Sequence, residues 1–352
     1  MLARLGAFFA GWRGLGRFWL LIAASLAVAV VALQLSFSPP APEPTVATRP
    51  APAVVPPEPI RPRPERAAAA AAPAVQRPGR DTPGPVADPD PALLETAPGT
   101  SEAMPRIGAD GRMAMQVYAA GFDRSSRRPK VGVVLAGIGL IQAESDEAIR
   151  TLPHGITLAV SPYARDPSKL LAAARAAEHE YLLSIPMEPQ GFPLNDPGRQ
   201  ALMTNLSSDQ NRTRLEWMLS RFAGYVGAIG AEGSLRGERF AGLPEQIDPV
   251  LAELAKRGLL YVDPRPGAAR LPLVWSADVD ILIDEAGTAA DIDDKLAQLA
   301  RLARERGGAL GFASAARPVT VQRLAAWANG LAADGLTLAP VSALVQPPPA
   351  VP

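Results

Sequence analysis

Short apolar runs alternate with amphipathic runs from Lys130 to Val345, and this alternation constrains the fold more than any other feature. Strands that alternate with helices imply parallel pairing and right-handed crossovers. Seven or eight such units predict an irregular (β/α) barrel, and a doubly wound open sheet is the alternative, because strand count alone does not establish closure. The predicted strands are Val131–Ile138, Ile156–Val160, Tyr181–Ile185, Tyr225–Ile229, Leu259–Val262, Val279–Ile283, Ala309–Phe312 and Leu336–Pro340.

The amphipathic runs predict helices between these strands. In the run that starts at Ile292, apolar residues recur at helical spacing and charged residues occupy the opposite face. The predicted helices are Pro167–Ala177, Gln210–Phe222, Gln246–Lys256, Ile292–Glu305 and Val319–Ala333.

The first predicted strand has the clearest functional context. In β/α barrels the carboxyl ends of the strands carry the chemistry. Here that end carries Ala136 and Gly137, where a metal-dependent hydrolase would place carboxylates. The sequence therefore raises the question of whether the domain retains catalytic activity.

The N-terminus predicts a membrane anchor. Residues 18–37 carry no charge and are long enough to span a bilayer as a helix. Arg4, Arg13 and Arg17 precede this run and no basic residue follows before Arg49, which places the stub 1–17 in the cytoplasm. We therefore expect a single-pass protein of the inner (cytoplasmic) membrane, with its folded domain in the periplasm. A cleaved signal peptide is the competing interpretation.

Composition separates the rest of the chain into segments. Residues 38–105 are rich in Pro and Ala and poor in aromatic residues, which predicts a disordered spacer. Residues 106–129 are expected to pack as a helical arm onto the domain 130–346, and 347–352 form a Pro-rich tail. With 35 basic and 35 acidic side chains, nothing favours a nucleic-acid partner, and the absence of Cys excludes disulfides and thiolate metal sites.

Several motifs in the predicted domain occur in the order of a known family. They are Thr157-Leu-Ala-Val-Ser-Pro-Tyr163, Glu178-His-Glu-Tyr-Leu-Leu-Ser-Ile-Pro-Met-Glu-Pro189, Tyr225-Val-Gly227 through Gly233-Ser234, Leu259-Leu-Tyr-Val-Asp-Pro-Arg265 and Pro340-Val-Ser-Ala-Leu344. Together they resemble the divergent polysaccharide deacetylases, carbohydrate esterases with a NodB-like β/α barrel. The resemblance implies the removal of acetyl groups from amino sugars and a role in the metabolism of envelope carbohydrates.

The departures from the family bear on function. Family members with a metal site carry Asp-Asp at Ala136-Gly137, a His at Ser184 and "NNH" at Ile229-Gly230-Ala231, and their late "GHP" motif reads Gly311-Phe312-Ala313 here. Such ligands hold a divalent ion that activates water and polarises the acyl carbonyl. Their joint loss predicts a pseudoenzyme without a metal cofactor.

Two histidines remain, on different elements. His154 lies in a turn context and is expected to be solvated or to cap a helix. His179 occupies a position where the family has the same residue, and we expect a structural role, with a ring nitrogen bonded to the backbone.

Eight polar residues remain as candidates for a cleft. Glu188 follows a strand inside the best preserved motif, and Asp263 and Arg265 follow another, where an ion pair is the alternative to ligand contact. Glu232 and Ser234 lie in the altered loop. We expect substrate binding by Glu188, Arg265, Glu232 and Ser234. The catalytic candidates are Glu188, Asp263 and Asp284. Two further carboxylates, Asp278 and Asp280, are also expected at the barrel mouth.

Three functional hypotheses follow. The first is a degenerate deacetylase that binds an envelope polysaccharide or an envelope protein through the barrel mouth. The second is an active deacetylase in which the remaining carboxylates bind a divalent metal, or act as a base without one. The third is a structural spacer of the envelope.

Overall fold

The computed structural model describes residues 77–82, 84–96, 103–268, 271 and 273–349. The predicted cytoplasmic stub, the predicted anchor 18–37 and residues 38–76 of the predicted spacer lie outside this part. Within the described ranges, no helix combines the length and apolar character that a membrane crossing requires.

A parallel sheet forms the core of the described domain. Its strand order is β8-β7-β6-β5-β4-β3-β10-β9, with β11 also paired to β3. The predicted α/β class with parallel strands is therefore confirmed. The strands are β3 (Lys130–Ile138), β4 (Ile156–Val160), β5 (Tyr181–Ser184), β6 (Gly227–Ile229), β7 (Leu260–Asp263), β8 (Ser276–Asp278), β9 (Ile281–Leu282), β10 (Gly308–Ala313) and β11 (Thr337–Leu338).

The two ends of this strand order meet at one short segment. β8 pairs with β7 and β9 pairs with β10, although only Val279 and Asp280 separate β8 from β9 in the chain. The Val279 N–H donates to the Asp263 carbonyl at 3.0 Å, and the Asp280 N–H donates to the Leu310 carbonyl at 2.8 Å. The strand predicted for 279–283 is present as the shorter β9, whereas β8 directly before it was not predicted. The chain crosses there from one edge of the curved sheet to the other.

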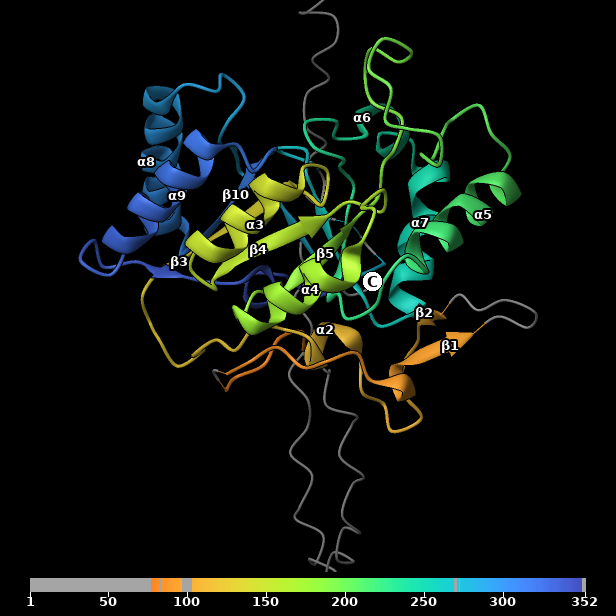
Figure 1. Ribbon diagram of the computed structural model, residues 1–352, viewed down its shortest axis with the longest axis horizontal. Coiled ribbons are helices and arrows are strands. Elements are labelled where there is room, and N and C mark those ends of the chain that lie inside the picture. The colour runs from red at the N-terminus through yellow and green to blue at the C-terminus, as the bar shows by residue number, and fades with distance from the viewer. Residues whose placement is uncertain (1–76, 83, 97–102, 269–270, 272, 350–352) are drawn as a thin grey trace, which may run out of the picture. The chain divides into compact units, whose positions relative to one another are not determined.

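Helices cover the outer face of the sheet (Figure 1). In α8, Ile292, Leu296 and Leu299 are buried as the periodicity predicts, the Thr288 hydroxyl caps the N-terminus, and Gly307 ends the helix with a positive φ. Two helices were not singled out from the sequence, α3 and the short α6. The helices are α3 (Gln142–Thr151), α4 (Pro167–Ala176), α5 (Ser208–Leu219), α6 (Glu238–Ala241), α7 (Pro244–Lys256), α8 (Ala289–Arg306) and α9 (Pro318–Gly330).

The contacts of β5 identify which of its residues face the inside of the sheet. The Tyr181 hydroxyl donates to the Ala223 carbonyl and accepts from Arg175 of α4, so Tyr181 faces the covering helices. Successive side chains of a strand point to opposite faces. Glu180, Leu182 and Ser184 therefore face the interior.

The segment before β3 forms an ordered arm. It contains the hairpin β1 (Leu94–Thr96) with β2 (Ala103–Pro105), and its one α-helix among the described residues is α2 (Ala114–Val117). The predicted helical arm 106–129 is thus mostly non-helical. Val86 and Leu93 are buried in the core, so the packed structure begins before the predicted boundary at residue 105, which corrects that boundary.

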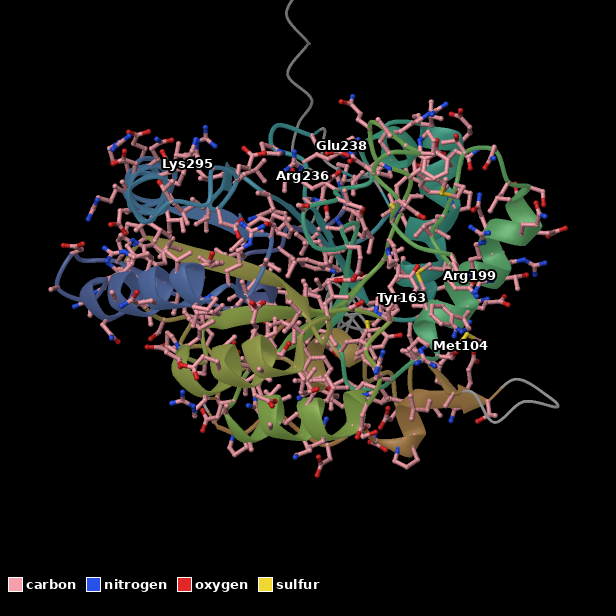
Figure 2. The ribbon with its side chains drawn as sticks, turned by 45° about the horizontal axis from the view of Figure 1, so that its top comes forward. Met104, Tyr163, Arg199, Arg236, Glu238 and Lys295 are labelled. Carbon is pink, nitrogen blue, oxygen red and sulfur yellow. The ribbon has the colours of Figure 1, made fainter. Side chains whose placement is uncertain are left out.

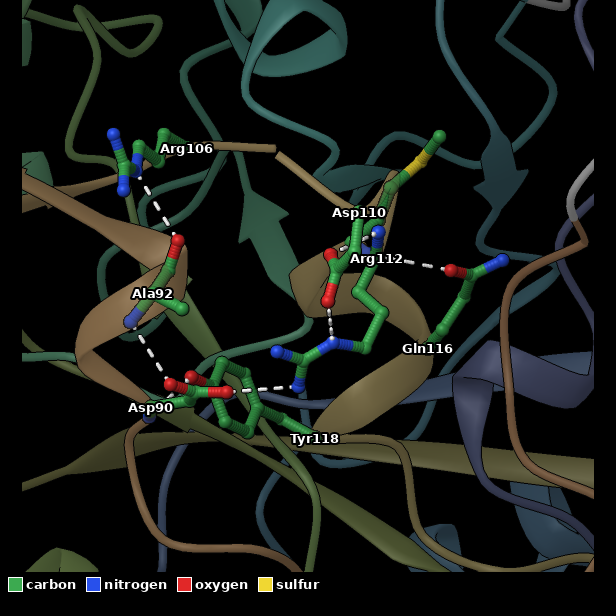
Figure 3. A network of polar contacts seen from close by, with 8 residues as sticks. Asp90, Ala92, Arg106, Asp110, Arg112, Gln116 and Tyr118 are labelled. Carbon is green, nitrogen blue, oxygen red and sulfur yellow. Dashed lines mark hydrogen bonds and ion pairs between the residues drawn. The ribbon is translucent and has the colours of Figure 1, made fainter. Parts of the chain in front are cut away.

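A polar network fixes the shape of the arm (Figure 3). The Asp90 carboxylate accepts from the Ala92 N–H and from the Arg112 guanidinium, both at 2.8 Å, and the Tyr118 hydroxyl accepts from the Asp90 N–H at 2.8 Å. Hydrogen bonds to Ala92 and Arg112 lower the pKa of Asp90. The arm is therefore held by specific bonds as well as by burial.

The arm packs at the N-terminal ends of the strands. Glu180, directly before β5, accepts from the Ala120 N–H at 3.0 Å. Arg257, just before β7, bonds to Glu95 and to the Pro105 carbonyl, both at 2.7 Å. The arm lies at the end of the domain opposite α6 (Figure 1). The carboxyl ends of the strands are therefore left for a site.

Candidate functional site

A cavity of about 460 Å³ lies at the carboxyl ends of β9 and β10. The loops after β5 and β6 complete its walls. It occupies the position in which parallel β/α folds carry their ligands. The polar residues that line it are Gln190, Asn195, Ser234, Arg236, Glu238, Asp284, Glu285, Ser314 and Arg317, with Leu282 and Phe312 as apolar lining.

Asp284 is the candidate catalytic carboxylate that the structure places in this cavity. It is buried, and it accepts from the Ser314 N–H at 2.7 Å and the Ala315 N–H at 3.2 Å. Both bonds hold the chain just after β10. Asp284 therefore shapes the cavity floor as well as lining it.

A charged group follows the loop after β6. Arg236 forms ion pairs with Glu238 at 3.3 Å and with Glu285 at 3.1 Å. Arg236 and Glu238 lie side by side, well apart from Lys295 of α8 (Figure 2). Arg317 makes no ion pair within the described part of the chain. The rim thus offers both signs of charge and many hydrogen-bonding groups.

Glu232 lies beneath this rim and is 8% exposed. Neither of its carboxylate oxygens has a hydrogen-bond partner in the described structure. Burial raises the pKa of Glu232 to about 7, because removal from water disfavours the charged form. The Ser161 hydroxyl is close enough to lower that pKa, although it makes no bond of regular geometry. Ser234, two residues on, is exposed and lines the cavity.

The positions at which the family places metal ligands hold small residues. Ala136, Ser184 and Ala231 are buried, and Gly137 has a φ of +77°. A Cβ at Gly137 would lie 3.4 Å from the Ser314 carbonyl oxygen, next to the cavity. Among the described residues, no group of three His, Asp or Glu is arranged to hold a metal ion. The donor set does not fit a divalent metal at this place.

Glu188 does not line the cavity. Its Oε2 accepts from the Thr204 N–H and from the Thr204 hydroxyl, both at 2.6 Å, and its Oε1 pairs with Arg239 at 3.0 Å. Pro189 and Gln190, which follow it, do line the cavity. Glu188 therefore connects the loop after β5 to α6, and both of its carboxylate oxygens already have partners.

Asp263 and Arg265 form the ion pair considered from the sequence. Arg265 Nε donates to Asp263 Oδ1 at 2.9 Å and Nη2 to Oδ2 at 2.6 Å, and the Arg265 N–H also donates to Oδ1 at 3.0 Å. The hydrogen bonds that Arg265 donates to Asp263 raise the pKa of Arg265. Neither residue lines the cavity.

Asp278 ends β8 in register with Asp263 of β7, and Asp280 follows it in the crossing to β9. Both line a separate cavity of about 500 Å³ beside Lys130 and Gly308, at the starts of β3 and β10. Asp280 pairs with Arg306 at 2.9 Å and accepts from the Leu310 N–H at 2.9 Å. Neither residue lines the cavity at the carboxyl ends of β9 and β10, because the chain at 279–280 crosses from β8 to pair with β10.

The two histidines have the surroundings expected of structural residues. His179 is fully buried, and its Nδ1 lies 2.8 Å from the Ile156 carbonyl oxygen. Burial lowers the pKa of His179 and favours the neutral ring. His154 is exposed in a turn. Neither is near the cavity lining.

Sequence reasoning missed most of the cavity rim. Arg236 and Glu238 follow the altered loop after Ser234 within four residues, and their alternating charges were the available signal. Arg317 and Glu285 each follow a strand by three or four residues. Nothing in their local pattern separates them from ordinary surface charges.

Fold and site together define an α/β domain of parallel strands with a polar cavity at the carboxyl ends of β9 and β10. The sequence profile of the family described as divergent polysaccharide deacetylase matches residues 133–345. The chain belongs to this family, as its motifs predicted.

Two solved structures resemble the domain. An uncharacterized protein of Agrobacterium tumefaciens C58 is 31% identical with a TM-score of 0.65, over 69% of this chain and 100% of that chain. The catalytic domain of a peptidoglycan N-acetylglucosamine deacetylase from Eubacterium rectale is 10% identical with a TM-score of 0.40, over 60% of this chain and 88% of that chain. The second likeness is too low to carry an argument. The comparison with curated proteins gave no match.

Proposed function

We propose that this protein is a membrane-anchored, extracytoplasmic member of its family that binds an envelope glycan through the barrel mouth and has lost metal-dependent deacetylation. The observation that carries the proposal is the replacement of the ligand positions as a set. Ala136, Gly137, Ser184 and Ala231 offer no carboxylate or imidazole, while a cavity is present next to Gly137. A family scaffold with an intact cleft and no ligand set supports binding without metal chemistry.

The lining of the cavity supports a carbohydrate as its ligand. Gln190, Asn195 and Ser234 present amide and hydroxyl groups, and Arg236 and Glu238 present planar charged groups. Such side chains match the hydroxyl and amide groups of sugars, and few apolar residues compete with them. The arm covers the opposite end of the domain, so the mouth is the end left for an extended polymer.

The test is glycan binding combined with an assay of acetate release on the purified chain. Chitin-type and peptidoglycan-type oligosaccharides would be titrated with and without added Mn²⁺, Zn²⁺ or chelator. We expect saturable binding that chelator does not change and no acetate release. Arg236→Ala should weaken binding about tenfold, while Arg199→Ala, whose side chain does not line the cavity, should leave it unchanged. Metal-dependent acetate release would contradict the proposal.

One observation favours a second candidate, a deacetylase that works without metal. The pKa of Glu232 at about 7 suits a general acid or base at neutral pH. That enzyme would release acetate in the presence of chelator and lose this activity in Glu232→Gln.

A further inference from the structure

The buried carboxyl group of Glu232 lacks hydrogen-bond partners in the free protein. Its carboxyl group is more than nine-tenths buried, and both oxygens lack a hydrogen-bond partner in the described structure. A buried polar group in this condition costs free energy, and native proteins retain few of them. A ligand that supplies donors would remove this cost.

The Glu232 carboxyl group lies near a hydroxyl group from a second strand end. Glu232 follows β6, and the Ser161 hydroxyl that acts on it follows β4. β5 lies between these strands and ends at Ser184, whose side chain faces the interior and whose hydroxyl is buried without a partner. The Ser161 hydroxyl and the Glu232 carboxyl group thus form an oxygen cluster at the ends of β4 and β6. Ser184, at the end of β5, is one of the positions at which family members with a metal site carry a ligand.

One tight turn connects Glu232 to the lining of the cavity. Glu232 and Leu235 close a tight turn through reciprocal backbone bonds of 2.8 and 3.0 Å, and Gly233 at its tip has a φ of +56°. Ser234 and Leu235 of the same turn line the cavity. A Cβ at Gly233 would meet only the Ser314 carbonyl oxygen, at 3.8 Å. Because Glu232 itself does not line the cavity, a ligand reaches the carboxyl group only when this turn moves.

The functional groups of an amino sugar differ in how many hydrogen bonds they can donate to the oxygen cluster. A hydroxyl group supplies one donor, and an acetamido group supplies one N–H together with an acyl chain. A free amino group in its ammonium form supplies three donors and the charge that a carboxylate attracts. The acidic residues Glu238, Asp284 and Glu285 at the rim, against Arg236 and Arg317, add to this preference for a cation.

We propose that the mouth recognises a de-N-acetylated amino sugar, whose free amino group is bound by Glu232 with Ser161. This inference rests on the proposed glycan-binding function and names its ligand class. A metal centre attracts the acyl oxygen of an acetylated sugar, whereas the carboxyl group at this place attracts the amine that remains when the acetyl group is gone. The protein would then bind deacetylated glycan selectively without catalysing the deacetylation.

Proton linkage distinguishes this role from a structural one. Because the pKa of Glu232 is about 7 in the free protein, the carboxyl group is largely protonated at pH 6. Binding an ammonium group requires the carboxylate, so binding at pH 6 should release a proton. Calorimetric titration in two buffers of different ionisation enthalpy measures this proton directly.

The experiment compares fully de-N-acetylated chitotetraose with its N-acetylated counterpart by isothermal titration of the purified chain. We expect the de-N-acetylated form to bind at least tenfold more tightly at pH 7, with proton release at pH 6. Glu232→Gln should abolish both the preference and the proton release, because an amide carries no charge. Glu305→Gln, an exposed substitution on α8, is the matched control and should change neither.

Each outcome separates the two proposals. Equal or tighter binding of the acetylated form, or an unchanged preference in Glu232→Gln, overturns the inference and leaves the glycan-binding function standing. Failure of the chain to bind either oligosaccharide overturns both for this class of polymer. Thermal unfolding at pH 8 confirms that Glu232→Gln is folded, and we expect no loss of stability there, since the variant lacks the buried charge.

Discussion

Glu180 and Ser342 are joined by two hydrogen bonds inside the domain, although 162 residues separate them in the chain. The Ser342 N–H donates to Oε1 at 3.0 Å and the Ser342 hydroxyl to Oε2 at 2.6 Å. Thr157 and Ala120 donate to the same carboxyl group. Burial raises the pKa of Glu180, and these four donors oppose that rise. One carboxyl group thus connects β4, β5, the arm and the C-terminal segment.

Ser342→Ala should lower the free energy of unfolding by about 1.5–3 kcal/mol, because it removes a donor from a fully buried carboxyl group. Urea unfolding of the chain measures this. Ser168→Ala, an exposed position on α4, is the control and should change stability by less than about 0.5 kcal/mol. Equal stability of the two variants would mean that Glu180 does not depend on the Ser342 hydroxyl.

The stability of the domain should fall as the pH rises through the range set by Glu232. Its pKa is about 7 in the folded chain against an ordinary value of 4.5, so the folded state holds a proton that the unfolded state has lost. Between those values each pH unit costs about 1.4 kcal/mol, which gives a loss on the order of 3 kcal/mol by pH 8. Glu232→Gln should remove this loss.

The measurement is chemical unfolding of both proteins at pH 5 and pH 8. The difference in unfolding free energy between Glu232→Gln and the natural chain should be small at pH 5 and favour the variant at pH 8. A variant that is less stable at pH 8 would show that the carboxylate has a partner in the folded chain.

Arg257 should hold the hairpin of the arm to the domain. It is 6% exposed and contacts Glu253, Glu95 and the Pro105 carbonyl. Arg257→Ala leaves these acceptors without their shared donor and should cost about 3 kcal/mol. Amide hydrogen exchange should speed up at 94–96 and 103–105 more than in β3. Uniform exchange across the whole domain would instead indicate that the arm and the sheet unfold as one unit.

The sequence predicted the strands that are buried along their whole length. Ile156–Val160 matches β4 residue for residue, because every position in it is buried and apolar or bonded. The break at Val279–Asp280 was not visible, because the backbone partners there are Asp263 and Leu310 on opposite edges of the sheet. Local patterning identifies an extended segment but not which neighbour it bonds.

The same limit explains the outcome for the candidate site. Asp284 and Ser234 follow strand ends and do line the cavity. Glu188 also follows a strand, yet Thr204, sixteen residues later, accounts for one of its oxygens. The burial of Glu232 could not be predicted, since its small neighbours Ala231 and Gly233 are equally compatible with an exposed loop. The local sequence pattern predicts where a residue lies along a strand. It does not predict the partner of a side chain, because that partner can belong to a loop far away in the sequence.

The last prediction separates the structural ion pair from the binding site. Asp263 is fully buried and receives three hydrogen bonds from Arg265, so Arg265→Leu leaves a buried carboxylate without its cation. We expect the free energy of unfolding to fall by about 3–5 kcal/mol. The double variant Asp263→Asn with Arg265→Leu should recover part of this loss, because no buried charge remains. Glycan affinity of the folded fraction should stay within about twofold of the natural chain in both variants, since neither side chain lines the cavity. A tenfold loss of affinity in the stable double variant would indicate that Arg265 contacts the glycan, as its position after β7 predicted.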